Sequence, residues 1–361
     1  MPNSQNSPAN IVAMKAAFAK YTLDYINPAG TSRGTLLKKD TYFLKIWDAE
    51  NPDIFGIGEC ALFKGLSKED NDTYEEKLKE LCRNIGIGAE TDLAGYSSIM
   101  FGLECAINDL ANGGKRIYFP SDFADGNADI VINGLVWMGT HDEMLKRIDE
   151  KVALGFNTIK LKVGAIDLES ELSLLKHIRN RYSSLDLTVR IDANGGFKPE
   201  NALETIDKFA KYDVHSLEQP IKQGNWNEMA RICRNSSIPI ALDEELIGIT
   251  DIDERIKLVE TIKPKYLIIK PSLLGGLASS EMWLRIAASH DIGAWITSAL
   301  ESNIGLNAIA EWTYTLQPRI AQGLGTGGLF TNNIESPLYL ESEHLRKNKK
   351  INWTLPEFDW K

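Results

Sequence analysis

Residues 158–164 read TIKLKVG, and this stretch decides the fold. Apolar side chains alternate here with Lys160 and Lys162, so both ammonium groups point to the same side of the predicted strand. An exposed edge strand with a solvated lysine face is the alternative interpretation. The continuous apolar opposite face and the glycine that follows at once favour a buried strand. The sequence therefore predicts a strand that aims two lysines into one enclosed space.

Short apolar runs of the same kind recur along the chain, with amphipathic helical stretches between most of them. Strand–helix alternation predicts a parallel sheet with right-handed crossovers, and eight such units predict a closed α/β barrel of the TIM type. An open doubly wound sheet is the alternative, but no G-x-G-x-x-G motif follows the first run. The runs are DIVINGLVWMG (129–139), NTIKLKVG (157–164), DLTVRIDANG (186–195), VHSLEQPI (214–221), IPIALDEEL (238–246), KYLIIKPS (265–272), IGAWITSAL (292–300) and RIAQGLGTGG (319–328).

The first part of the chain has a different pattern. Residues 10–60 are predicted to form strands and residues 68–113 to form two helices, which together indicate an α+β domain. The end of the chain lies beyond the last predicted strand and is expected to fold back on that domain. We therefore expect an α+β domain at residues 1–127, a barrel at 128–330 and a C-terminal tail at 331–361.

Composition narrows the class of protein. The chain has 361 residues, a formal net charge of −10 and a pI near 5.2, which argues against general nucleic-acid binding and gives no basic anchor for a membrane surface. No stretch reaches the roughly 18 apolar residues of a membrane span, and the N-terminus lacks a signal-peptide core. We expect a cytoplasmic protein. The four scattered cysteines form no C-x-x-C pair and are expected to be buried thiols.

Charged residues stand where the predicted barrel strands end. Asp192, Glu218, Asp243 and Lys270 each close one apolar run, at spacings of 26, 25 and 27 residues, and Lys162 precedes Asp192 by 30. Each spacing matches one strand–helix unit, so these side chains are expected on neighbouring strands at one rim. Reactive residues of such barrels lie at the carboxyl ends of the strands. The residue before each of these four is apolar and would face the helices, which leaves the charges facing inward.

Three converging carboxylates cannot all stay ionised without a partner. A hard divalent cation resolves this conflict, because Mg²⁺ prefers oxygen ligands and keeps positions open for water or substrate. We therefore predict one Mg²⁺, with Mn²⁺ as a substitute, on Asp192, Glu218 and Asp243. A helix N-cap is the alternative role for any single one of these acids. No histidine or cysteine cluster indicates zinc.

The lysines beside these acids are expected to act as bases. A divalent cation and neighbouring ammonium groups lower the pKa of a lysine, and a lysine that is partly neutral can remove a proton. Lysine bases beside a metal suit removal of a proton α to a carboxylate, since the resulting enolate needs electrostatic stabilisation. Lys270 could instead extend from its strand end into solvent.

Together these motifs resemble the enolase superfamily, and within it the muconate-lactonizing-enzyme-like subgroup. The matching pieces are the K-x-K of TIKLKVG, then RIDANGGF, SLEQPI, IPIALDEEL and YLIIKPSLLGG, with GIGEC and FGLECAINDL in the first domain. The likeness covers nearly the whole chain. It implies a modified (β/α)₇β barrel with an N-terminal α+β capping domain that the C-terminal tail completes.

Within the subgroup, the chain is similar to the o-succinylbenzoate synthases of menaquinone biosynthesis, through GTSRGTLLKKDTYFLKI, TSALESNIGLNAIAEW and QGLGTGGLF. This resemblance implies a hydro-lyase that removes water from SHCHC, a succinyl-bearing hydroxycyclohexadiene carboxylate. Lys162 would be the base and then the acid, Lys270 would stabilise the enolate, and Lys160 would hold the substrate carboxylate and lower the pKa of Lys162. Asn194 and Glu244 would orient these groups.

Substrate contacts are expected from two regions. Thr31, Ser32 and Arg33 lie in a glycine-flanked loop of the kind that closes as a lid, although Arg33 could equally be solvated. At the seventh and eighth strand ends the candidates are Ser298, Glu301 and Gly323. Ser298 could donate to the succinyl carboxylate or cap a helix. For Glu301, the alternative to a substrate contact is a simple ion pair with a lysine.

Two other functions stay open. N-acylamino acid racemases and dipeptide epimerases carry the same lysines and acids, but the epimerases typically have a D-x-D motif where this chain has Gly323, Leu324 and Gly325. Other synthases of the family often carry an acid in the segment where this chain has Gly325, so the substrate contacts of the last strand stay open. A non-catalytic metal-binding protein is the third function. Barrel enzymes of this kind are often homo-oligomers, and the oligomeric state is left open.

Overall fold

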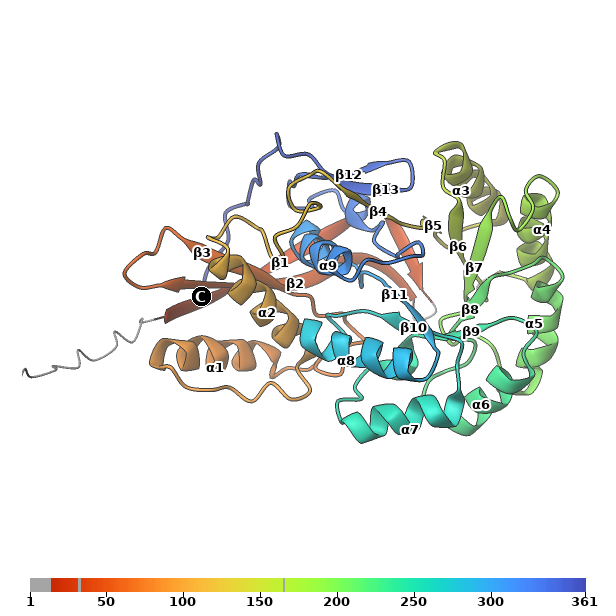
Figure 1. The fold of residues 1–361 in the computed structure, drawn as a ribbon, viewed down its shortest axis with the longest axis horizontal. Coiled ribbons are helices and arrows are strands. Elements are labelled where there is room, and N and C mark those ends of the chain that lie inside the picture. The colour runs from red at the N-terminus through yellow and green to blue at the C-terminus, as the bar shows by residue number, and fades with distance from the viewer. Residues whose placement is uncertain (1–13, 32–33, 165) are drawn as a thin grey trace, which may run out of the picture.

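The computed structural model describes residues 14–31, 34–164 and 166–361. A curved parallel sheet forms the larger part of this fold, and the helices that follow its strands lie on its outside, as the arc of helices in Figure 1 shows. In pairing order its strands are β11 (Gly293–Ile296), β10 (Tyr266–Ile269), β9 (Ile240–Leu242), β8 (Ser216–Glu218), β7 (Thr188–Asp192), β6 (Thr158–Lys162) and β5 (Gly134–Val136). The helices are α3 (His141–Ala153), α4 (Leu168–Arg179), α5 (Ala202–Ala210), α6 (Trp226–Asn235), α7 (Ile252–Ile262), α8 (Gly276–Ser289) and α9 (Asn303–Thr315).

The two faces of this sheet bury different side chains. Ile191 and Leu217, each just before an acid, are fully buried in the main core with apolar residues of the surrounding helices. A second cluster contains Ala241, Ile268 and Trp295, which have the opposite parity along their strands. The strands are therefore largely apolar on both faces, and apart from Lys160 of β6 and Arg190 of β7 their charged side chains stand at the strand ends.

The eighth predicted run connects the two edges of the sheet without forming a regular strand. Gln322 exchanges backbone hydrogen bonds with the segment before β5, and Gly323 does so with β11, at 2.8–3.0 Å. Only single bridges form there, because the glycines of this segment have low strand propensity. The predicted parallel α/β architecture is confirmed as a curved parallel sheet, and the eighth strand is reduced to these bridges.

The first predicted run is divided between two sheets. Its second half is β5, whereas its first half, β4 (Asp129–Val131), pairs antiparallel with β13 (His344–Lys347) near the end of the chain. The third strand of this small sheet is β12 (Leu338–Glu341). The prediction of a single strand was wrong, because β13 pairs with the first half of the run and draws it into a second sheet. The Asp129 carboxylate strengthens this pairing through His344 at 2.8 Å and Arg346 at 3.0 Å.

A separate antiparallel sheet precedes the parallel one. Its strands are β1 (Met14–Thr31), β2 (Gly34–Asp48) and β3 (Phe55–Cys60), and the helices α1 (Tyr74–Ile87) and α2 (Ser97–Ala111) pack on it. The close approach of α2 to β3 requires glycine: a Cβ on Gly58 would lie 2.8 Å from the carbonyl carbon of Gly102. The last residues of the chain return to this sheet, since Lys361 and Phe18 exchange backbone hydrogen bonds of 3.1 and 2.8 Å.

Two glutamates connect this N-terminal sheet and α2 to the helices of the parallel sheet. Glu104 of α2 accepts a hydrogen bond from the backbone N–H of Leu277, at the start of α8. Glu59 of β3 accepts from the N–H groups of Ser302 and Gly305, both at 3.0 Å, at the start of α9. Side-chain carboxylates thus satisfy helix N–H groups that have no partner within the helix. None of the helices in the described residues combines the length and apolar character that a membrane crossing needs.

Candidate functional site

The strand register aligns the predicted site residues along one edge of the parallel sheet. Lys162 of β6 is opposite Asp192 of β7, and Asp192 is opposite Glu218 of β8. Asp243 directly follows β9, and Lys270 directly follows β10. All five therefore lie at the carboxyl ends of neighbouring strands, and the three acids are at most 2% exposed.

Lysine ammonium groups lie between these buried acids. Lys160 Nζ is 2.6 Å from a Glu218 oxygen and 3.0 Å from an Asp192 oxygen, so one cation contacts two carboxylates. Lys162 Nζ is 2.6 Å from the same Asp192 oxygen. The two lysines of the K-x-K stretch thus point to one side of β6, into the same cluster.

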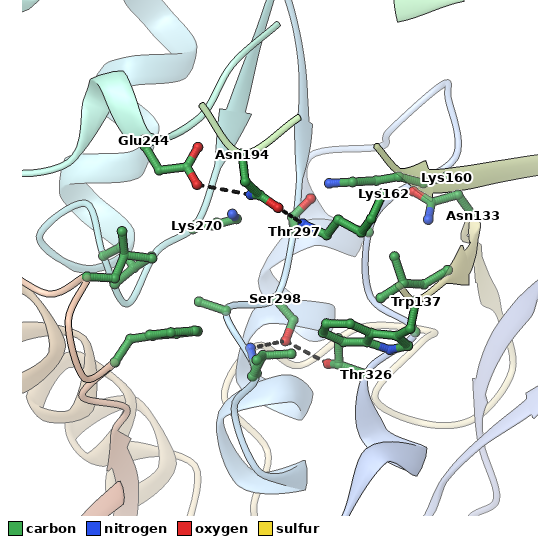
Figure 2. Close-up of a pocket in the computed structure, with 18 residues that line it drawn as sticks. Asn133, Trp137, Lys160, Lys162, Asn194, Glu244, Lys270, Thr297, Ser298 and Thr326 are labelled. Atoms are coloured by element: carbon green, nitrogen blue, oxygen red, sulfur yellow. Dashed lines mark hydrogen bonds between the residues drawn. The ribbon is translucent and has the colours of Figure 1, made fainter. Parts of the chain in front are cut away.

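A second ion pair and a hydrogen-bonded chain complete the cluster. Lys270 donates to Asp243 from the far side of the acids. Lys162 donates to the side-chain oxygen of Asn194 at 2.5 Å, and Asn194 donates to Glu244 at 3.0 Å, a chain visible in Figure 2. Asn194 therefore contacts Lys162, and Glu244 contacts Asn194, whereas their role as orienting groups stays a prediction.

Burial and crowding set the pKa values of these groups. Burial and the neighbouring charge of Asp192 raise the pKa of Glu218 to about 8. Burial alone would raise the pKa of Asp192, but Lys160 and Lys162 hold it well below its usual range. Burial also raises the pKa of Asp243 in spite of Lys270. The three enclosed acids thus repel one another, and the nearby ammonium groups outweigh burial and this repulsion only at Asp192.

The acids in turn act on the pKa values of Lys160 and Lys270. Burial would lower the pKa of Lys160, but Asp192 and Glu218 outweigh it and raise that pKa above its ordinary value. Asp243 does the same to Lys270. Lys160 and Lys270 thus each serve as a counter-ion to an acid, and the expected role of Lys162 as the base stays a prediction.

The acids have the right chemistry for a divalent cation. Within the described residues no three acids, histidines or cysteines form a ready-made metal cage, because the ammonium groups lie between the carboxylates. Lys160 is nevertheless a cation bound by two carboxylates at once, so these acids already accommodate one positive charge between them. Enclosed, all-oxygen donors on adjacent strands suit Mg²⁺. The residues present therefore fit the predicted metal, provided that the flexible lysine side chains turn aside.

A pocket of about 760 Å³, counted to its open mouth, lies over this cluster. Figure 2 shows its two ends: Lys160, Lys162 and Lys270 at one, and Ser298 with Thr326 at the other. The lining is otherwise mostly apolar. Its residues are Phe63, Leu66, Asn133, Leu135, Trp137, Lys160, Lys162, Asn194, Glu244, Lys270, Leu273, Thr297, Ser298, Ala299, Leu300, Gly323, Gly325 and Thr326. Among these described residues the single acid is Glu244, beside the lysines.

The predicted substrate contacts are only partly brought together. Ser298 lines the pocket, but its hydroxyl donates to Glu301 at 2.6 Å, so its hydrogen is already used. Glu301 is fully buried behind that wall and pairs with no lysine by a direct contact. Gly323 lines the pocket against Thr297, where a Cβ would lie 3.0 Å from the threonine Cβ.

The predicted lid lies largely outside the described residues. Ser32 and Arg33 are not described, and for Thr31 only the backbone is, paired with Gly34 across the hairpin of β1 and β2. Their proposed contact with substrate therefore stays a prediction.

Sequence reasoning missed one wall of the pocket and one buried brace. Leu135 of β5 and the residues that flank this strand, Asn133 and Trp137, all line the pocket, a period-two pattern that was already visible in the first apolar run. Gln219 follows Glu218 and binds the backbone N–H of Asp243 at 3.1 Å through its side-chain oxygen. No local sequence signal reveals this contact between Gln219 and Asp243, because it joins the ends of two different strands.

Comparison with known proteins places this geometry among related molecules. The model of the Enolase C-terminal domain-like family matches residues 143–334. The chain is 41% identical to an o-succinylbenzoate synthase of Desulfotalea psychrophila, over 91% of this chain and 97% of that protein. The crystal structure of MenC from the same organism superposes with a TM-score of 0.82 at 36% identity, over 92% of this chain and 99% of that one. A dipeptide epimerase of Enterococcus faecalis, complexed with Mg and the dipeptide L-Leu-L-Tyr, shares the fold with a TM-score of 0.77 at 19% identity, over 93% and 97%.

Proposed function

Because the chain belongs to the Enolase C-terminal domain-like family, in the muconate-lactonizing-enzyme-like part of the enolase superfamily, we propose that it acts as an o-succinylbenzoate synthase. This enzyme is a carbon–oxygen lyase that removes water from SHCHC, and the product would enter menaquinone biosynthesis. The observation that carries the proposal is the pocket itself: Lys162 and Lys270 enter it from strands four positions apart in the sheet, beside three buried acids.

The ring carboxylate of the substrate would bind at the lysine end of the pocket. Asp192, Glu218 and Asp243 would hold one Mg²⁺, with Mn²⁺ as a substitute, and the ion when bound would supply electrostatic stabilisation of the enolate. Lys160 is 6% exposed among these acids and would contribute a further positive charge to the carboxylate. Binding of a cation would also release Lys160 and Lys270 from their present acid partners, which removes the cause of the raised pKa of these two lysines.

The reaction then needs one base and one acid on the same face of the ring. Neutral Lys162 takes the proton α to the carboxylate, and the electron pair of that C–H bond forms the enolate. As the electrons return, the ring C–O bond breaks, and the Lys162 ammonium gives its proton to the departing hydroxide, so that water leaves. Lys270 stays protonated opposite and stabilises the planar enolate by its charge and by a cation–π contact. Aromatisation of the ring drives the step.

Racemisation or epimerisation of N-acylamino acids or dipeptides is the second candidate, since it uses the same two lysines. A pocket for an amino group needs a carboxylate to bind the ammonium. Gly323 and Gly325 stand where the related epimerases are expected to carry acids, and the single acid of the described lining is engaged by Asn194. This composition favours the synthase.

We also propose that the curved sheet is the (β/α)₇β barrel expected from the sequence. The backbone bonds of Gln322 and Gly323 to both sheet edges support this assignment. The proposed parts are a capping domain at 1–127, the barrel at 128–330 and the tail at 331–361.

The test is direct incubation of the pure protein with SHCHC and Mg²⁺, with the aromatic product followed by its absorbance. We expect product formation that chelation of the metal abolishes, and Lys162→Ala to be inactive. Lys270→Arg should abolish any racemisation, which needs both lysines, but leave some dehydration. No aromatic product, together with rapid α-proton exchange in acylated amino acids, would reject the synthase in favour of the second candidate.

A further inference from the structure

A buried lysine outside the lysine cluster has no hydrogen-bond partner. Lys39 of β2 is 7% exposed, and its ammonium group donates to no atom of the described residues. Thr41 and Phe43 follow on the same face of the strand, and Phe43 packs against Ile304 at the start of α9. The side chain therefore points from the N-terminal sheet toward α9. A buried ammonium without a partner is costly, so the charge requires an explanation.

Burial lowers the pKa of Lys39, and two fully buried carboxylates, Glu59 and Glu301, counter this effect. Glu59 accepts four hydrogen bonds, from the Thr41 hydroxyl at 2.8 Å and from N–H and hydroxyl groups at the start of α9 at 2.6–3.0 Å. Glu301 accepts three, at 2.6–2.7 Å, from two serine hydroxyls and one backbone N–H. Acceptance of so many donors is the pattern of ionised carboxylates. One ammonium thus faces two negative charges.

These charges lie directly behind one wall of the substrate pocket. Two of the donors to Glu301 belong to Ser298 and Ala299, which line the pocket. Phe63 lines the pocket as well, and on its other side it lines a groove that contains Lys39. In the described lining the cationic side chains are the three lysines at the opposite end, shown in Figure 2. An anionic group near Ser298 would therefore meet the field of Glu301 before that of any lysine of the lining.

We propose that Lys39 is a specificity-determining positioning residue that offsets the charge of Glu301 and Glu59, so that this wall accepts the second carboxylate of a dianionic substrate. The inference rests on the proposed function, whose substrate carries a ring carboxylate and a succinyl carboxylate. Lys39 acts through Glu301 and through space, without touching the substrate. Its effect should therefore depend on the charge at the distal end of the ligand and leave the chemistry at Lys162 nearly unchanged.

The experiment compares two ligands on matched variants. The dianion is the product o-succinylbenzoate, and the monoanion is its analogue with an amide in place of the succinyl carboxylate; both affinities are measured by calorimetry. For Lys39→Met we expect dianion binding to weaken about tenfold or more, since one charge is removed at close range in a poorly screened site. Monoanion binding should stay within about twofold. KM for SHCHC should rise in parallel, with kcat changed by less than about threefold.

Two further variants separate charge from packing. Lys38→Met is the matched control: Lys38 is on the opposite face of β2, exposed and paired with Asp24 at 3.1 Å, and its loss should leave both affinities unchanged. The double variant Lys39→Met with Glu301→Gln removes one charge of each sign and should recover most of the dianion affinity. A purely structural role for Lys39 would predict no such recovery.

Circular dichroism checks that Lys39→Met is folded, and Lys39→Gln, which retains a polar end, replaces it if it is not. An unchanged preference for dianion over monoanion in the folded variant overturns the proposal, as does absence of recovery in the double variant. Failure of the proposed function would look different, because the wild-type protein would then neither convert SHCHC nor bind the product.

Discussion

Gln219 offers the sharpest test of how the acids are held. It is fully buried and follows Glu218, and its side-chain oxygen accepts from the N–H groups of Asp243 at 3.1 Å and Glu245 at 3.2 Å. Its amide nitrogen donates to the carbonyl of Ile221 at 2.9 Å and to Glu245 at 3.1 Å. One side chain thus ties together the ends of β8 and β9, which carry two of the proposed metal ligands.

Gln219→Ala removes all of these bonds at once. Two buried N–H groups lose their acceptor, at about 1–3 kcal/mol each, and the loss of one buried methylene group adds about 0.8 kcal/mol. The free energy of unfolding should therefore fall by about 3 kcal/mol or more. The backbone that carries Asp243 loses its anchor as well, so affinity for Mg²⁺ should weaken about tenfold.

Urea unfolding followed by circular dichroism gives the stability, and calorimetric titration of the folded variant gives the affinity for Mg²⁺. The matched control is Gln223→Ala, an exposed glutamine four residues later whose loss should change neither quantity. A stability within about 1 kcal/mol of wild type would refute the hydrogen-bond accounting. A large loss of stability with unchanged Mg²⁺ affinity would show that the brace supports the fold but does not position Asp243.

Three further predictions follow from single contacts. Gly323→Ala should raise KM at least several-fold while the protein still folds. The added Cβ would lie 3.0 Å from the Thr297 Cβ and push the Thr297 side chain into the pocket. Steady-state kinetics that match wild type would contradict this prediction. Glu104→Ala should lower the free energy of unfolding in urea by about 2 kcal/mol, since it removes the acceptor for the Leu277 N–H, and no change would argue against the cap. Burial lowers the pKa of His215 to about 4, so the neutral imidazole contributes stability that is fully present above pH ~6.5 and is lost as the pH falls toward 4. Between pH 7.5 and 5 the free energy of unfolding should therefore drop by about 1–2 kcal/mol, a figure already discounted for the partial exposure of the side chain. Urea unfolding at the two pH values should show a smaller drop in His215→Phe.

The spacing of charges along the sequence predicted their alignment on neighbouring strand ends, because strand register is a local property. Lys162, Asp192 and Glu218 each end an apolar strand, and parallel neighbours bring such ends together whatever the intervening helices contain. The alternation of Lys160 and Lys162 similarly fixed their common direction. These features depend only on periodicity and on the length of one strand–helix unit.

Other features depended on partners that sequence distance hides. The first apolar run was divided because β13, more than 200 residues later, pairs with its first half. The contacts of Lys160 with Glu218 and Asp192 could not be predicted in detail, because spacing does not give the positions of individual carboxylate oxygens. Gln219 escaped notice because its role is a contact between strands, and glutamine after a strand has no distinctive local meaning.

The two glutamates of the first region show why the pocket cannot be understood from the strand ends alone. Glu59 and Glu104 each follow, by one or two residues, a glycine that permits close packing of β3 against α2. Their carboxylates then reach across to the starts of α9 and α8. The loops that precede those helices carry Ser298 and Leu273 into the pocket. Because each loop is held between a strand of the parallel sheet and a helix fixed from the N-terminal sheet, the shape of that wall depends on both parts of the chain. The buried charges of Lys39 and Glu59 therefore lie where a change in the first region can alter substrate preference without altering the lysines that do the chemistry.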